Sequence, residues 1–411
     1  MGEINDIKPY FPAAEYQERY RRASGFMEEA GLDALIITCR ENIKYFMGFN
    51  TGLYNIDDKY FNCFGILPAD MGLKPTLVIR EGNEGTASLS WVEDKRFWPC
   101  TRGEYGGVAH TETILEVLRE KGLNRARIGL ELGTSMGLKH ELYKDLEHKL
   151  VGALLLDGSP VIWDCRKIKS DMEVEFIRKA CDITCGAYMK GFQEIKRGTS
   201  EKQIARTIYA AMTREGADLF GPGVIMMYSG RKRETWCDAL PSDYVLEEGD
   251  LLQVDGGCTF GDYKSDIMRM ACVGKPTREQ ADNYNVARDA YYSGLEKVRE
   301  GVRCSDVWKE GMKVWLKHGF DDFVKNRKRA NWCIDGHSIG LDIHEPPNIG
   351  LAVDEELKEN MVITLEFFNT HNGTWPLKDA RWWYVIENIV RVKKEGCEVL
   401  SSRMPDDLWI A

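Results

Sequence analysis

Two acidic residues eleven positions apart, Asp255 and Asp266, lie in two strand-like runs that a turn-rich stretch joins within residues 251–273. A turn centred between Phe260 and Gly261 would place the two carboxylates directly opposite each other on one face of an antiparallel pair, about 5 Å apart. Like charges in that position destabilise a sheet, and in a buried site both stay ionised only when a cation lies between them. The pair is therefore either part of a cation site or two solvated turn residues.

Two further acids stand inside apolar, strand-like runs. Glu366 lies within MVITLEFF and Glu387 within YVIENIVRV. Burying an unpaired carboxylate costs several kcal/mol, so each of these acids needs a counter-charge. Arg269, Arg381 or Arg391 could supply it as salt-bridge partners, which is the alternative to a bound cation. Four acids on strands of one domain nevertheless exceed what these arginines readily neutralise.

Histidine is scarce, with seven in the chain, and two of them, His337 and His344, fall in one glycine-rich segment. After paired acids this favours a site over a structural histidine. Four carboxylates and one imidazole form a hard ligand set suited to Mn, Fe, Co or Zn, and two such ions about 3.5–4 Å apart could share bridging ligands. A Gly-x-Ser-x-Gly pattern overlaps at 336–340, but the flanking residues cannot form the strand and helix that a serine-hydrolase elbow needs.

These residues need elements to hold them, and 411 residues exceed what one hydrophobic core usually supports. We expect two domains. In residues 1–160 helical and strand-like runs alternate, which favours α/β layers. The predicted elements are a helix over 15–31 that ends at Gly31 and strands at 32–38, 75–80 and 126–132.

The second domain is expected over residues 161–411, because turn residues and the start of a long charged helix make 157–170 the best boundary. It carries all the residues singled out above. The pattern predicts helices over 172–196 and 200–215, then strands that one further helix, near 278–300, interrupts.

The composition is that of an ordinary globular protein, with 43% hydrophobic and 29% charged residues. Its 55 basic and 65 acidic residues give a net charge of −10 without a basic stripe, so nucleic acid is not an expected partner. No apolar stretch suits a signal peptide or a membrane span, so we expect a cytoplasmic protein that does not contact the membrane. The twelve cysteines lack a C-x-x-C pair and are expected to be reduced.

Taken together, the motif residues resemble a known family. An Asp, a second Asp eleven later, a His that opens an H-x-x-G-x-x-x-H-E-x-P segment and two Glu on strands are similar to the signature of the creatinase, prolidase and methionine aminopeptidase superfamily. Residues 15–49 and 165–180 resemble the family's N-terminal domain and its entry to the catalytic domain. The resemblance implies an α+β protein in which a smaller α/β creatinase-type domain precedes a pita-bread catalytic domain. It also implies a homodimer.

The resemblance carries over to individual ligands. It implies that Asp255 chelates one divalent ion and that His337 and Glu366 hold a second. Asp266 and Glu387 would bridge the two ions.

The resemblance also implies a reaction. A metal-bridged hydroxide would attack an amide carbon, with Glu366 as proton shuttle and His344 as the donor that stabilises the developing oxyanion. The expected substrate is a small molecule or short peptide, as for an Xaa-Pro dipeptidase or aminopeptidase. Since all five ligand types are present, a non-catalytic relative is disfavoured.

Two departures from the family pattern concern the substrate. The peptidases place a further histidine before the first aspartate, where this chain has Asp238 or Cys237, and Phe367 replaces the proline that usually follows Glu366. Relatives without that histidine include enzymes that are not peptidases. The alternative function is therefore a creatinase-type C–N hydrolase or a metal-dependent lyase of a small onium compound such as dimethylsulfoniopropionate.

Three residues before the first aspartate are candidates for substrate binding. Trp236 with Asp238 could form a box for a cation or a proline ring, since a cation over Trp gains about 0.5–2 kcal/mol. Arg231 could hold a substrate carboxylate. Core packing for the tryptophan and a solvated loop for the arginine are the alternatives.

Overall fold

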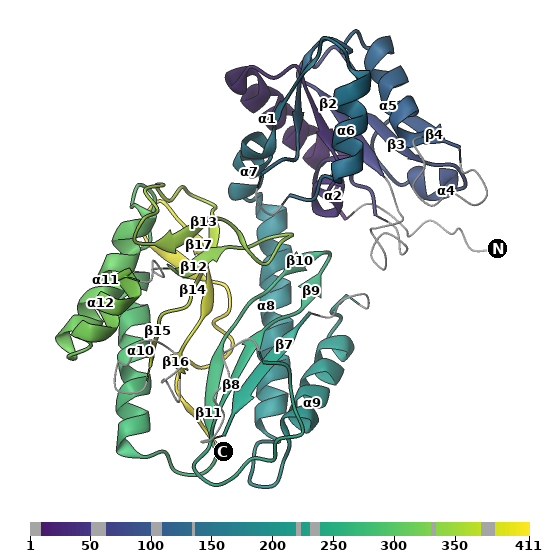
Figure 1. Cartoon of the computed structure of the whole chain (residues 1–411). Helices are drawn as coiled ribbons and strands as arrows, with labels where there is room; N and C mark the ends of the chain where they lie inside the picture. The colour runs from purple at the N-terminus through teal and green to yellow at the C-terminus, as the bar shows by residue number, and fades with distance from the viewer. Residues whose placement is uncertain are drawn as a thin grey trace. The chain divides into compact units, whose positions relative to one another are not determined.

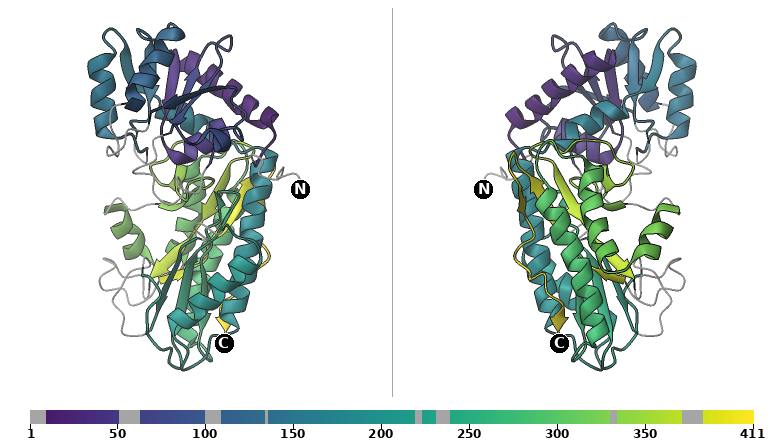
Figure 2. Two further views of the ribbon diagram at one scale, coloured as in Figure 1. Left: turned by 90° about the vertical axis from the view of Figure 1, so that its right-hand side faces the viewer. Right: turned by 90° about the vertical axis from the view of Figure 1, so that its left-hand side faces the viewer.

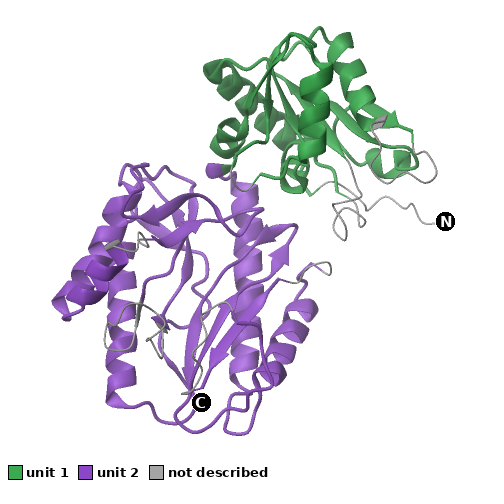
Figure 3. Cartoon of the chain, viewed as in Figure 1, with its two compact units in different colours: residues 1–166 green, residues 167–411 purple. Residues whose placement is uncertain are grey.

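The computed structural model divides into two compact units, residues 1–166 and residues 167–411 (Figure 3). It describes residues 10–50, 63–99, 109–133, 136–218, 223–230, 239–329, 334–370 and 383–411. The sequence placed the domain boundary between residues 160 and 161, and the division in the structure falls after Arg166. Each unit has a hydrophobic core of its own.

Unit 1 is built on one six-stranded sheet with the order β4-β3-β2-β1-β5-β6 (Figure 1). β1, β5 and β6 run parallel, as do β3 and β4, whereas β2 is antiparallel to both of its neighbours. The strands are β1 (Ala34–Ile37), β2 (Phe64–Pro68), β3 (Thr76–Arg80), β4 (Asp94–Trp98), β5 (Arg127–Leu130) and β6 (Leu154–Asp157). The helices are α1 (Ala13–Ala30), α2 (Arg40–Met47), α4 (Glu84–Ala87), α5 (Ala109–Glu120), α6 (His140–Lys149) and α7 (Ser159–Lys167).

Local sequence explains these elements well. Helix α1 ends where Gly31 adopts a left-handed conformation with φ 62°, a position that favours glycine. The apolar run that follows it forms β1, whose four residues are all buried. The helix and the strands predicted for this half are therefore confirmed at β1, β3 and β5.

Unit 2 combines two larger sheets with helices on one side of them. The sheets have the orders β19-β11-β8-β7 and β13-β12-β14-β17-β18, and two-stranded ribbons pair β9 with β10 and β15 with β16. In the right-hand view of Figure 2, α8, α10 and α11 stand side by side. The helices are α8 (Asp171–Phe192), α9 (Glu201–Arg214), α10 (Arg278–Lys297), α11 (Cys304–Lys317) and α12 (Asp321–Arg329).

The strands of unit 2 come from widely separated parts of the sequence. They are β7 (Ile225–Ser229), β8 (Leu251–Gly256), β9 (Thr259–Phe260), β10 (Tyr263–Lys264), β11 (Arg269–Cys272), β12 (Ile334–Ser338), β13 (Glu345–Gly350), β14 (Val362–Leu365), β15 (Phe368–Thr370), β16 (Trp383–Val385), β17 (Asn388–Val392), β18 (Cys397–Val399) and β19 (Trp409–Ile410). Their apolar side chains form one core with α10 and α11, which contribute Tyr284, Tyr291, Trp308 and Trp315. This core fixes the strand ends that carry the candidate site.

The prediction of a single helix among these strands was wrong, because α11 and α12 follow α10 directly. The signal for α11 was present. Val307, Trp308, Gly311 and Trp315 recur at helical spacing and are all buried.

The predicted turn of the first acidic hairpin was also wrong by one residue. Tyr263 pairs with Phe260, so the turn is Gly261–Asp262 rather than Phe260–Gly261. Both turn residues have positive φ, 58° and 70°, which is the conformation of a two-residue hairpin turn and one that a phenylalanine would adopt only under strain.

The corrected turn changes the partner of the first acid. In the observed register Arg269 pairs with Val254, so Met268, not Asp266, stands across from Asp255. A shift of two residues keeps a side chain on the same face of a sheet. Asp266 therefore stays on the face of Asp255 as its diagonal neighbour.

Candidate metal centre

Six candidate residues lie at strand ends of unit 2. Asp255 is on β8, Asp266 lies between β10 and β11, His337 is on β12, His344 precedes β13, Glu366 follows β14 and Glu387 precedes β17. Asp255 belongs to one sheet, Asp266 precedes β11 of that sheet, and the other four lie in the second sheet or at its margins. The structure thus brings together residues up to 132 positions apart, Asp255 and Glu387.

Two overlapping groups of ligand atoms define the site. Atoms of Asp255, Asp266 and Glu387 lie within 4.8 Å of one another, and so do atoms of Asp266, His337 and His344. Nε2 of His337 is 3.8 Å from Oδ2 of Asp266 and 4.0 Å from Oε1 of Glu387. Asp266 belongs to both groups and is the point at which they meet.

The acidic side chains of this site lie close to one another in a buried region. Burial raises the pKa of Asp266 to about 7, although its hydrogen bond with Asp255 acts in the opposite direction. Burial, followed by the charges of Asp266 and Asp335, raises the pKa of Glu366 to about 8. Burial and the charges of Asp266, Glu366 and Asp255 raise the pKa of Glu387 well above its usual value. Without cations these carboxylates cannot all be ionised at neutral pH.

Glu387 gives the most direct test of whether a metal fits. Its side chain is fully buried, neither carboxylate oxygen has a hydrogen-bond partner among the described residues, and the nearby Thr364 hydroxyl offsets only part of the rise in its pKa. A buried carboxylate in that state is costly, and a cation removes the cost. The donor set of oxygens and one imidazole suits hard or borderline divalent metals.

The orientation and the protonation state of His337 suit a neutral metal ligand. Its Nδ1 lies 3.0 Å from the carbonyl oxygen of Ser338, which can only accept, so Nδ1 carries the proton and Nε2 faces the acids. Burial, followed by the charge of His344, lowers the pKa of His337 to about 3. The two imidazole rings are 4.3 Å apart, and His344 is exposed. His344 therefore stands at the open side of the site.

The arginines proposed as counter-charges do not neutralise these acids. Arg269 binds the side chains of Asn388 and Asp406, and Arg391 binds those of Asn360 and Asp171. The alternative of salt bridges to Glu366 and Glu387 is therefore wrong for these two arginines. Arg381 lies outside the described residues.

Two buried ion pairs beside the site were not predicted from the sequence. Lys169 Nζ lies 3.0 Å from Glu345, the residue after His344, and Arg327 lies 3.0 Å from Asp335, two residues before His337. All four side chains are at most 1% exposed. The acids were visible in the histidine segment, but their partners are distant or unmarked in the sequence.

The three substrate-binding candidates, Arg231, Trp236 and Asp238, lie outside the described residues. The same holds for Cys237. Among the described helices, none is both long and apolar enough to cross a membrane.

Comparison with known proteins decides the family. Residues 175–394, more than half of the chain, match the sequence profile of metallopeptidase family M24, and residues 19–168 match that of the creatinase/prolidase N-terminal domain. The chain belongs to metallopeptidase family M24. Its M24 membership makes it a metal-dependent hydrolase and implies divalent metal ions. The predicted superfamily, fold class and enzyme class are confirmed.

Individual relatives agree with this assignment. The Xaa-Pro dipeptidase of Pyrococcus furiosus is 28% identical over 350 residues, which cover 85% of this M24 chain and 90% of that protein. The crystal structure of dipeptidase PepE from Mycobacterium ulcerans matches with a TM-score of 0.80 and 25% identity over 97% of this chain and 99% of that chain. The Xaa-Pro dipeptidase from Bacillus anthracis has the same fold, with a TM-score of 0.79 and 21% identity over 96% of this chain and 100% of that chain.

Proposed function

We propose that the protein is a dinuclear metallopeptidase that hydrolyses the amide bond of short Xaa-Pro peptides. The observation that carries this proposal is the convergence of buried acids around Glu387, whose carboxylate oxygens have no hydrogen-bond partner among the described residues. A relative that covers most of the chain is an Xaa-Pro dipeptidase, which supports the substrate class.

The two groups of ligand atoms support sites for two divalent ions of Mn, Fe, Co or Zn; Glu366 belongs to neither group, and the family resemblance adds it as a ligand. Asp255 would hold one ion, and His337 with Glu366 the other. Asp266 and Glu387 would serve both ions, and Asp266 is the member that the two groups share. Ions bound there would supply Lewis acidity and lower the pKa of a water.

The chain's own residues would move the proton and stabilise the developing charge. Glu366 is half-buried among the acids, and its carboxylate would take the proton of the attacking water and return it to the amine nitrogen as the C–N bond breaks. His344, on the exposed side, would donate a hydrogen bond to the carbonyl oxygen on which negative charge develops.

One sequence feature favours a second candidate function. No histidine occurs between His148 and His318, so the position that carries a substrate-contacting histidine in the resembled peptidases is filled by Asp238 or Cys237. An acidic side chain there suits a cationic substrate. The second candidate is therefore hydrolysis of a non-peptide C–N bond, or elimination from a small onium compound, at the same metal centre.

Metal analysis and a substrate panel test these proposals together. We expect two equivalents of transition metal per chain, and Mn-dependent cleavage of Ala-Pro and Leu-Pro that exceeds cleavage of Ala-Ala. Turnover of creatine or dimethylsulfoniopropionate without Xaa-Pro cleavage would replace the first proposal by the second. Less than one equivalent of metal, with activity that survives chelators, would reject both.

The oligomeric state and the cellular location of the protein remain predictions. The homodimer implied by the resemblance is tested by light scattering of the purified protein. The cytoplasmic location is tested by fractionation of the cells that produce it.

A further inference from the structure

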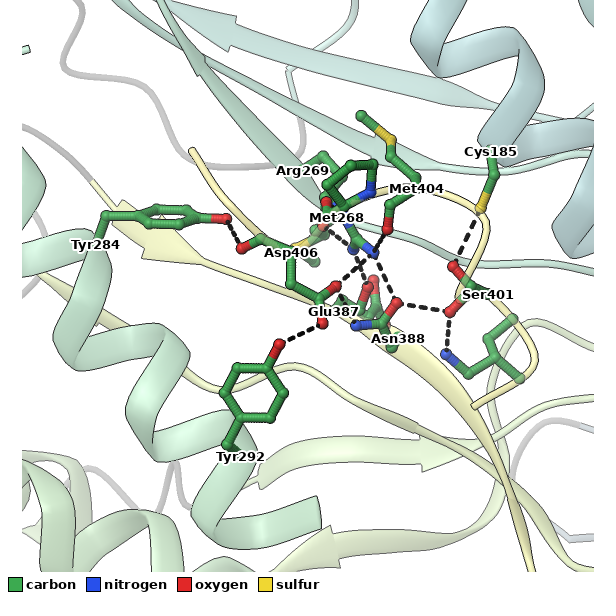
Figure 4. Close-up of polar contacts among 12 residues, drawn as sticks. Cys185, Met268, Arg269, Tyr284, Tyr292, Glu387, Asn388, Ser401, Met404 and Asp406 are labelled. Atoms are coloured by element: carbon green, nitrogen blue, oxygen red, sulfur yellow. Dashed lines mark hydrogen bonds and ion pairs between the residues drawn. The ribbon is translucent and has the colours of Figure 1, made fainter. Parts of the chain in front are cut away.

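Arg269 is a fully buried arginine whose donors are all engaged close to the candidate metal centre. Figure 4 shows its guanidinium among the side chains of Asn388 and Asp406 and beside Glu387. Nε and the two Nη atoms donate to the carbonyl oxygens of Met268, Glu387, Met404 and Pro405 and to the side chains of Asn388 and Asp406. None of these acceptors is a ligand carboxylate.

Hydrogen bonds donated by Nη1 of Arg269 join the segments that carry the two proposed shared ligands, Asp266 and Glu387. Nη1 lies 2.9 Å from the carbonyl oxygen of Met268, two residues after Asp266, and 2.6 Å from that of Glu387. The backbone N–H of Glu387 also donates to the carbonyl oxygen of Met268, at 3.3 Å. Asp266 precedes β11 of one sheet and Glu387 precedes β17 of the other, and Arg269 cross-links these two segments.

The C-terminal segment holds this guanidinium in place. Asp406 Oδ1 accepts from Arg269 at 3.0 Å and from Asn388 at 3.0 Å, while Oδ2 accepts from Tyr292 at 2.9 Å. The Tyr284 hydroxyl binds the backbone carbonyl of Asp406. The charge of Arg269 is thus balanced by Asp406 rather than by one of the proposed ligand carboxylates.

We propose that Arg269 is a positioning residue that sets the separation of Asp266 and Glu387, with Asp406 as its counter-ion. The proposal rests on the dinuclear centre proposed above. A buried ion pair that merely stabilised the fold would contribute to the stability of the metal-free protein and leave metal affinity unchanged. A cross-link between two ligand segments must contribute to metal affinity, because groups behind the ligands hold them in binding geometry.

The test compares Arg269→Lys with Arg391→Lys in the full chain. Arg391 lies on β17, four residues after Glu387, but it binds Asn360 and Asp171 rather than the segments that carry Asp266 and Glu387. Lysine keeps the charge and cannot reproduce the planar, multi-acceptor contacts of a guanidinium. We expect Mn(II) titrated into metal-free protein to bind roughly 10- to 100-fold more weakly to R269K than to wild type. R391K should stay within about twofold of wild type.

A second readout separates positioning from folding. For each variant, the melting temperature with saturating Mn(II) is compared with the melting temperature of the same variant without metal. A general loss of stability cancels in this difference. If R269K does not fold, Asp406→Asn is measured instead, with an expected loss in Mn(II) affinity of roughly three- to tenfold in the same direction.

Several outcomes would overturn the proposal. These are unchanged Mn(II) affinity in a folded R269K, unchanged affinity in D406N, or an equal loss in R269K and R391K. Wild-type stoichiometry distinguishes these failures from failure of the proposed function. Two equivalents bound by wild type with unchanged R269K affinity would refute only the role of Arg269.

Discussion

Replacing Asp266 by asparagine is expected to stabilise the metal-free protein and to destabilise the metal-bound protein. Asp266 is 7% exposed and shares its surroundings with three other acids. Asparagine has nearly the same shape but no charge to lose on burial. The variant therefore removes the electrostatic cost of the metal-free site and, at the same time, one proposed shared ligand.

The size of the effect follows from the raised pKa of Asp266, 3.8 in its reference state and about 7 in the protein. A difference of that size corresponds to about 4 kcal/mol, since each tenfold change in proton affinity is worth about 1.4 kcal/mol. Between these pKa values the unfolded chain is ionised while the native protein keeps its proton, so the stability of the metal-free protein falls as pH rises. The raised pKa of Asp266 should therefore lower the free energy of unfolding of the metal-free protein by about 2 kcal/mol at pH 5 and by about 4 kcal/mol at pH 8.

The assay is thermal unfolding of metal-free wild type and D266N at pH 5 and pH 8, repeated with Mn(II). D266N should melt higher than wild type without metal, and the gap should widen at pH 8. With saturating Mn(II) the order should reverse, because ligand binding stabilises the wild type more. Asp243→Asn is the control, since Asp243 is 85% exposed in a surface pair with Lys202 and should show neither trend.

Two results would refute this reasoning. If metal-free D266N melts below wild type at pH 8, the carboxylate is stabilised by the protein itself and the site is not built for cations. If the gap does not depend on pH, the pKa of Asp266 is not raised in the native protein.

Three further predictions concern individual groups. Glu366→Gln should lower kcat about 10²- to 10⁴-fold by removing the proton acceptor, as measured by dipeptide hydrolysis at saturating Mn(II), and a change in KM alone would contradict that role. His344→Gln should lower kcat about 10²-fold or more while metal content by mass spectrometry stays at the wild-type value, because His344 is not one of the five proposed ligands. Gly261→Val should lower the free energy of unfolding, measured by chemical denaturation, by about 1–3 kcal/mol, because Gly261 has φ 58° and a Cβ there would lie 2.6 Å from the Phe176 ring. Unchanged stability would mean that the turn tolerates another conformation.

Much of the candidate site could be predicted from the sequence because its acidic residues interrupt apolar strand-like runs. Glu366 and Glu387 stand out since an acid rarely occupies such a run without a partner. The histidine segment stands out because histidine is rare in this chain. These signals come from residues that are neighbours in the sequence, and the strands on which the acids lie are predicted from the same short segments.

The contacts behind the ligands could not be predicted in the same way. Arg269 was considered only as a counter-charge for the acids, whereas it binds the backbone carbonyl of Glu387 and a carboxylate 137 residues away, Asp406. No periodicity or spacing marks such a pair. Its existence depends on how the C-terminal segment packs against the strands, and tertiary packing determines that.

The turn of the acidic hairpin was misplaced for a different reason. Glycine at position 261 can occupy either place of a two-residue turn, and the choice depends on whether Phe260 or Asp262 accepts a positive φ. Asp tolerates that conformation better than Phe. Turn preferences of the flanking residues, applied more strictly, would have given the correct register.

The register of this hairpin limits how its length can change. Side chains alternate between the two faces of a strand, so one residue inserted into an arm of the hairpin, between the Gly261–Asp262 turn and either carboxylate, would turn that carboxylate toward the opposite face. Two inserted residues would restore the facing, and an insertion in the turn itself would only lengthen the loop. Libraries that lengthen an arm should therefore yield functional clones in steps of two, and an odd-length arm that still binds metal would need a bulge to absorb the extra residue.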